Sequence, residues 1–247
     1  MDEAAGLGSG AGPGTMLSRM EARAADGTAP AEGLRERKKR LMRRQLSDTA
    51  TEMFLERGFD AVRVSEVAEA CGVSEKTVFN YFPTKESLLL DRWEGTVTAL
   101  RAGLAEPGVS PVEVSVRILA DELNGMTYAL EHAEDPDQAR LSFRRFGALI
   151  HDTPSLQAQQ RIMMDQVTGV VAQTLAERAG ISEDDPEPQI AAAALLGLWQ
   201  IHFQSLRRHL GGTGTPAEVR AAVTGDVQRA ARLIDAGLRS FPPFMRG

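Results

Sequence analysis

Residues 64–82 constrain the fold of this chain more than any other stretch. They predict two short helices, over 65–71 and 75–82, that are joined by a tight turn at Gly72. Ser74 can cap the second helix, because a serine hydroxyl accepts a hydrogen bond from a backbone N–H group of the first turn. Two helices in this arrangement are typical of proteins that read DNA.

The flanking sequence completes a small helical head. Residues 35–57 carry apolar side chains at helical spacing, and Gly58 marks the end of that helix. Thr84 can cap a fourth helix over 85–104, which Pro83 separates from the third. The side chains that we expect to form the head's core are Leu46, Ala50, Met53, Phe54, Val67, Ala68, Cys71, Val78 and Phe82.

The rest of the chain also reads as helical. Breaks rich in proline, glycine and aspartate separate segments that we expect to be helices, over 111–133, 137–151, 155–180, 187–210 and 216–240. No segment alternates apolar and polar residues over a strand's length. The sequence therefore predicts an all-α fold of about nine helices. Its units are a disordered tail (1–33), a helix-turn-helix head (34–83) and a larger helical body (84–247).

Charge is distributed unevenly along the chain. The net charge is -6, yet residues 35–44 hold seven Lys and Arg, whereas residues 93–247 hold 14 basic and 19 acidic residues. A basic patch on an acidic body suits focal binding to a phosphate backbone. A single cysteine excludes an internal disulfide, and no apolar run reaches the roughly 18 residues that span a bilayer. We expect a cytoplasmic protein that does not bind a membrane.

Motifs for catalysis are absent from the sequence. It contains no nucleophile elbow and no dinucleotide fingerprint, and its four histidines have no metal-ligand spacing. The glycine-rich run 8–14 lacks the strand, helix and lysine of a phosphate loop. We therefore expect no enzymatic activity, no catalytic residue, no metal and no cofactor.

Three segments resemble the N-terminal domain of TetR-type transcriptional regulators. They are Met53–Asp60, Val67–Ser74 and Thr77–Leu88, and the similarity extends over about residues 40–90. The remainder resembles the family only in helical character and length. The resemblance implies a homodimer that binds a palindromic operator on double-stranded DNA, with an inducer pocket and the dimer interface in the body.

The resemblance also implies which residues contact DNA. The third helix would enter the major groove, where Lys76 can donate to guanine and Asn80 can pair with an adenine edge or a phosphate. The full set of expected contacts is Arg40, Arg44, Arg63, Ser65, Ser74, Glu75, Lys76, Thr77, Asn80, Tyr81 and Lys85.

Three positions depart from the family pattern. Val62 and Arg63 stand where small hydroxyl residues are common, so Arg63 would take over a phosphate contact. Phe79 stands where a tyrosine is common, which removes one hydrogen bond to phosphate. Glu75 is acidic where a basic residue is frequent.

Apolar side chains of the body are candidates for a ligand pocket. They are Phe143, Phe146, Ile150, Met163, Trp199 and Phe203. A helical core requires such residues in any case, so both interpretations stay open. Small residues over 191–197, together with the last helix, are candidates for a two-fold interface. The sequence favours a repressor that an unidentified small-molecule inducer releases from DNA; the alternative is a constitutive or activating DNA-binding regulator without an inducer.

Overall fold

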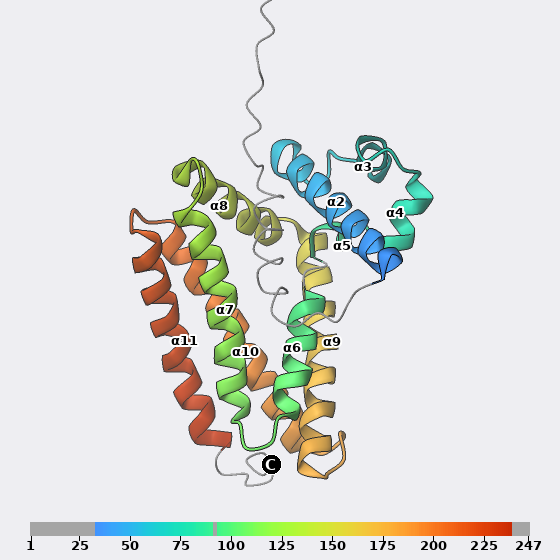
Figure 1. Ribbon diagram of the computed structural model, residues 1–247. Helices are drawn as coiled ribbons and strands as arrows, with labels where there is room; N and C mark the ends of the chain where they lie inside the picture. The colour runs from blue at the N-terminus through green and yellow to red at the C-terminus, as the bar shows by residue number, and fades with distance from the viewer. Residues whose placement is uncertain (1–32, 91–92, 239–247) are drawn as a thin grey trace, which may run out of the picture.

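The computed structural model describes residues 33–90 and 93–238, and within these ranges the chain forms ten helices and no strand (Figure 1). The helices are α2 (Leu34–Arg57), α3 (Val64–Ala70), α4 (Glu75–Tyr81), α5 (Ser87–Leu90), α6 (Trp93–Ala105), α7 (Pro111–Glu131), α8 (Pro136–Asp152), α9 (Pro154–Ala179), α10 (Pro186–Leu210) and α11 (Pro216–Leu238). The all-α prediction is confirmed. The expected tail over 1–33 lies outside the described residues except for Gly33.

One predicted helix corresponds to two observed ones. In place of a helix over 85–104, the structure has α5 and α6, and residues 91–92 between them lie outside the described ranges. The predicted cap at Thr84 is confirmed, because its Oγ1 accepts a hydrogen bond from the Ser87 N–H at 3.1 Å. The Ser87 hydroxyl in turn accepts from the Thr84 N–H at 3.2 Å.

Proline begins each of the helices from α7 to α11. Proline suits the first turn of a helix because its missing N–H would have no partner there and its φ is already helical. Asp135 adds a cap to α8, since its carboxylate accepts from the Gln138 N–H at 2.9 Å. Gly180 ends α9 in the left-handed conformation (φ 68°). These signals explain why the sequence located the body helices to within about two residues.

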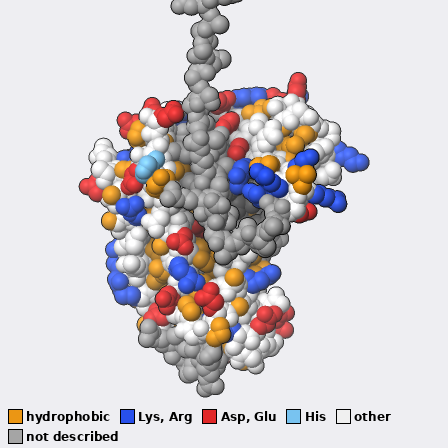
Figure 2. Space-filling model, viewed as in Figure 1, with side chains coloured by type: hydrophobic (Ala, Val, Ile, Leu, Met, Phe, Trp, Pro, Cys, Tyr) orange, Lys and Arg blue, Asp and Glu red, His pale blue; other side chains and the backbone are white. Residues whose placement is uncertain are grey.

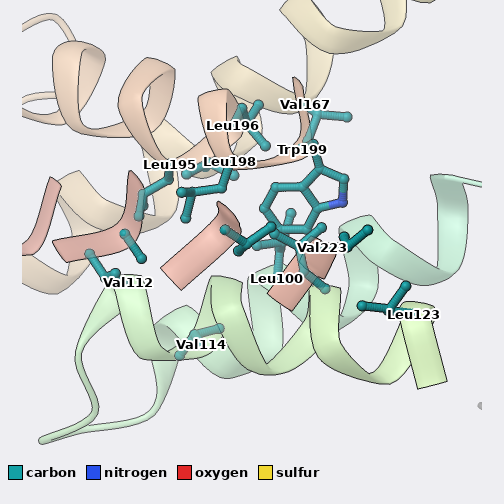
Figure 3. Close-up of a cluster of buried hydrophobic side chains, with 14 of the residues drawn as sticks. Leu100, Val112, Val114, Leu123, Val167, Leu195, Leu196, Leu198, Trp199 and Val223 are labelled. Carbon is teal, nitrogen blue, oxygen red and sulfur yellow. The ribbon is translucent and has the colours of Figure 1, made fainter. Parts of the chain in front are cut away.

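Two apolar cores hold the molecule together. The head cluster consists of Leu46, Ala50, Phe54, Phe59, Val62, Val67, Ala68, Val78, Phe82, Leu88, Leu89, Leu90 and Leu156. The body cluster is larger and is built mainly from α6, α7, α9, α10 and α11, which run side by side in Figure 1, with Ala139 added from α8. Figure 3 shows part of the body cluster around Trp199.

The head rests directly on two helices of the body. Leu156, near the start of α9, is fully buried in the head cluster. Phe146, Ile150 and Met163, from α8 and α9, pack against the same cluster. In Figure 1, α8 lies across the end of the body beside α2, and the first turns of α9 lie below α5. Packing therefore continues across the sequence boundary that we expected at residue 83.

Candidate nucleic-acid interface

The helix-turn-helix is built on the inner face of α2. Val67 and Ala68 of α3, together with Val78 of α4 and Phe82 just after it, are all buried in the head cluster, as the spacing predicted. Cys71, which we also expected inside, is only partly buried. Burial of Val78 and Phe82 fixes which side of α4 faces the core, because residues four apart share one face of a helix.

A left-handed glycine sets the angle between α3 and α4. Gly72 has φ 68°, and its N–H donates to the Glu69 carbonyl at 3.0 Å. The next N–H, of Val73, donates to the Ala68 carbonyl at 3.0 Å. A residue with a side chain would be strained at this φ, although none of the described atoms lies within 4 Å of the place that a Cβ would take.

Ser74 caps α4, as the sequence predicted. Its Oγ accepts from the Thr77 N–H at 3.1 Å and lies 2.8 Å from the Thr77 hydroxyl. Glu75, Lys76 and Asn80 are exposed on the side of the head away from its core. The cap and the buried face together hold these three side chains toward solvent.

A second set of contacts fixes the start of α3. The Arg63 N–H donates to Glu66 Oε2 at 2.7 Å, while Glu66 Oε1 forms an ion pair with Arg57 at 2.7 Å. The hydrogen bond from the Arg63 backbone is the main reason that the pKa of Glu66 lies below its usual value, and the interaction with Arg57 lowers it further. Arg63 and Ser65 are exposed beside this turn.

Lys85 has a structural partner that the sequence did not indicate. Its Nζ donates to the Phe59 carbonyl, and it lies 4.3 Å from the centroid of the Phe59 ring. The ammonium therefore ties the start of α5 to the loop after α2. The phosphate contact that we predicted for Lys85 stays a prediction.

Arg43 is a positioning residue that the sequence reasoning missed. Its NH1 donates to the Tyr81 carbonyl at 3.2 Å, and its guanidinium lies 5.0 Å from the centroid of the Phe82 ring. It thus stabilises the end of α4, where carbonyl groups lack helical partners. The only sequence signal that could have indicated this contact is the high number of arginines in residues 35–44.

Basic side chains gather on one face of the head. Figure 2 shows Lys and Arg side chains grouped where α2 and α4 lie in Figure 1. Arg40 is exposed, and Arg44 lines a shallow cleft on α2 with Leu41, Gln45, Asp48, Thr49 and Glu52. Thr77 and Tyr81 are partly buried. The predicted DNA contacts thus belong to one compact unit formed by α2, α3, α4 and the start of α5.

The six predicted pocket residues divide between the two cores. Phe146, Ile150 and Met163 pack against the head cluster. Trp199 is a member of the body cluster, against which Phe143 and Phe203 also pack. Within the described ranges, no group of three or more His, Cys, Asp or Glu side chains is placed to hold a metal ion. None of the described helices is long and apolar enough to cross a bilayer.

Two protein-family models match the chain. The model of bacterial regulatory proteins of the tetR family covers residues 46–91, which include the helix-turn-helix. The model of the MftR C-terminal domain covers residues 123–213, which extend from α7 to the end of α10.

Curated relatives agree with these matches. The HTH-type transcriptional regulator TcmR of Streptomyces glaucescens is 29% identical over 180 residues, 68% of this chain and 74% of the relative. The putative mycofactocin biosynthesis transcriptional regulator MftR of Mycobacterium tuberculosis is 29% identical over 153 residues, which cover 62% of this chain and 73% of the relative. The HTH-type transcriptional activator FasR of Mycolicibacterium smegmatis is 27% identical over 188 residues, which cover 76% of this chain and 80% of the relative.

Proposed function

Because the chain belongs to the TetR family of DNA-binding transcriptional regulators, we propose that it acts as a homodimeric repressor that a small molecule releases from a palindromic operator. The observation that carries the proposal is the fixed orientation of α4. Its Val78 face is buried, whereas Lys76 and Asn80 are held in solvent by the Ser74 cap. A short helix presented in this way fits the major groove of DNA.

In this proposal, base recognition and phosphate binding fall to different residues. Lys76 donates to guanine and Asn80 pairs with adenine, because these side chains match the hydrogen-bonding groups in the major groove. The backbone phosphates are bound around them by Arg40, Arg44, Arg63, Ser65, Ser74, Thr77, Tyr81 and Lys85. Glu75 lies at the same edge of α4 and limits the set of bases that this helix accepts.

The partner in the proposed dimer is a second copy packed against α10 and α11. These helices carry Ile190 and Leu233, whose side chains are 68% and 79% exposed. Large apolar side chains exposed on adjoining helices suit a self-complementary interface. Two heads held by such an interface can meet successive major grooves roughly 34–36 Å apart.

Release by an inducer is proposed to pass through the contact between head and body. In this proposal a shift of α8 or α9 is passed to the head through α2 and α5, which these helices contact. A coupling of about 1–3 kcal/mol changes operator affinity roughly 5–150-fold. The second candidate function is a constitutive or activating DNA-binding regulator without an inducer; the relative FasR is named as an activator.

A gel shift with the DNA that flanks the protein's own gene tests the proposal. We expect Lys76→Ala to weaken specific binding by about 1–3 kcal/mol, because a base contact is lost. The control is Arg40→Ala, which removes a phosphate contact and is expected to weaken operator and random DNA equally. Equal losses on both DNAs for Lys76→Ala would contradict base recognition by α4.

A further inference from the structure

A partly buried acidic side chain lies where α6, α7 and α10 of the body meet. Glu122 of α7 accepts a hydrogen bond from the Thr96 hydroxyl of α6 at 2.8 Å. Burial raises the pKa of Glu122, and the donors on Thr96 and Trp199 act in the opposite direction. Within the described residues no cation forms an ion pair with this carboxyl group. Glu122 is partly buried, and a carboxylate that is removed from water without a countercharge is costly.

Beside this carboxyl group is a buried donor without a partner. Trp199 of α10 is only 1% exposed, and its indole Nε1 forms no hydrogen bond within the described residues. The indole N–H lies beside Glu122 and stabilises its charged form, through a contact that is weaker than a well-formed hydrogen bond. Figure 3 shows the indole close to Leu100 of α6 and Val223 of α11. A buried N–H without a well-formed hydrogen bond is rare in folded proteins.

Aromatic rings flank the same place. The ring centroid of Trp93 lies 6.4 Å from that of Trp199 and 6.1 Å from that of Phe203. Trp93, Phe203 and Glu122 are all partly buried, whereas Trp199 is fully buried. Aromatic faces attract organic cations through the negative charge density above each ring.

The neighbouring His202 carries no charge that would repel a cation bound beside Glu122. His202, one turn beyond Trp199 on α10, is buried, and burial lowers its pKa to about 4. It is therefore neutral at physiological pH. The excess of acidic residues over 93–247, 19 against 14 basic ones, further favours cations over anions.

We propose that Glu122, Trp93, Trp199 and Phe203 form a binding site for a lipophilic organic cation. The positive charge of the ligand lies against the Glu122 carboxylate, and its apolar groups lie against Trp93 and Phe203. The cation supplies the missing countercharge, which a neutral ligand of the same shape does not. This inference rests on the proposed function, because the cation is the chemical class that we assign to the inducer.

The two tryptophans of the chain are both in this cluster, so their fluorescence measures binding without DNA. The probe is benzyltrimethylammonium, and its uncharged counterpart of nearly equal shape is neopentylbenzene. Each is titrated into the full chain, into Glu122→Gln and into Asp121→Asn. The last variant is the matched control, because it removes the same charge at the adjacent, exposed position. A melting curve for each variant confirms that it is folded.

We expect saturable binding of the cation to wild type and to Asp121→Asn, and a loss of about tenfold or more in Glu122→Gln. The neutral counterpart should bind more weakly and equally to all three proteins. The proposal is overturned if Glu122→Gln binds the cation as wild type does, if the neutral probe binds as well as the cation, or if no probe gives saturable binding.

The gel shift separates this site from the proposed function. Release of operator DNA by the cation in wild type and Asp121→Asn, but not in Glu122→Gln, supports both proposals. Cation binding by a protein that retains no DNA specifically would refute the regulator mechanism and leave the cation site intact. Specific DNA retention without cation binding would refute only the site.

Discussion

Truncation of Leu156 tests whether the head and the body share a core. Leu156 belongs to α9 yet is 0% exposed within the head cluster. Replacing a buried leucine by alanine costs about 2.7–5.0 kcal/mol, and less where neighbours can fill the space. The neighbours Phe146 and Met163 are only partly buried, and methionine adapts readily. We therefore expect Leu156→Ala to lower the free energy of unfolding by about 3 kcal/mol.

The assay is thermal unfolding of the full chain followed by two signals. Circular dichroism reports all helices, whereas tryptophan fluorescence reports only the body, because Trp93 and Trp199 pack in or against the body cluster. For a chain of this size, about 3 kcal/mol corresponds to a decrease in Tm of roughly 6–12 °C. Both signals should move together, since the truncated side chain joins the two units.

The control for this prediction is Ile162→Ala, on the same helix. The Ile162 side chain is 52% exposed, so its truncation should change stability by no more than about 0.5 kcal/mol. A decrease in Tm below about 2 °C for Leu156→Ala, or one equal to that of Ile162→Ala, would refute burial of Leu156 in the head cluster.

Two further variants test the cap of α4 and the buried histidine. Ser74→Ala should cost about 1 kcal/mol in chemical denaturation, because the Thr77 N–H loses its acceptor; a loss no larger than that of Ser65→Ala, on the exposed side of α3, would contradict this. The lowered pKa of His202, about 4 against an ordinary 6.5, means that the unfolded chain binds the proton more readily. The contribution of neutral His202 to the free energy of unfolding is therefore fully present above pH 6.5. It decreases by up to about 3 kcal/mol as the pH falls to 4. His202→Asn should lose less stability than wild type over that range, and parallel curves would exclude the effect.

Much of the head follows from local sequence. The spacing of Val78 and Phe82, the glycine at the turn and the hydroxyl of Ser74 each act within a few residues. Such signals depend on backbone geometry and on neighbouring N–H groups, so they can be read without the fold. The proline and glycine boundaries of the body helices belong to the same class.

The contacts between distant helices could not be predicted in this way. Lys85 and Phe59 are 26 positions apart, as are Thr96 and Glu122. Periodicity shows that a helix has an apolar face, but it does not show which other helix covers that face. For this reason the sequence placed Phe146 and Trp199 in one candidate pocket, although the two side chains pack against different cores.

The sequence alone therefore determined that the chain is helical, where most helices begin, and which side of α4 faces solvent. These properties arise from interactions within one or two helical turns. Only the tertiary structure decided that α9 contributes Leu156 to the head cluster, that Arg43 stabilises the end of α4, and that Glu122 lies beside the indole of Trp199. Those features depend on the angles and distances at which whole helices pack, which are set by side chains far apart in the chain.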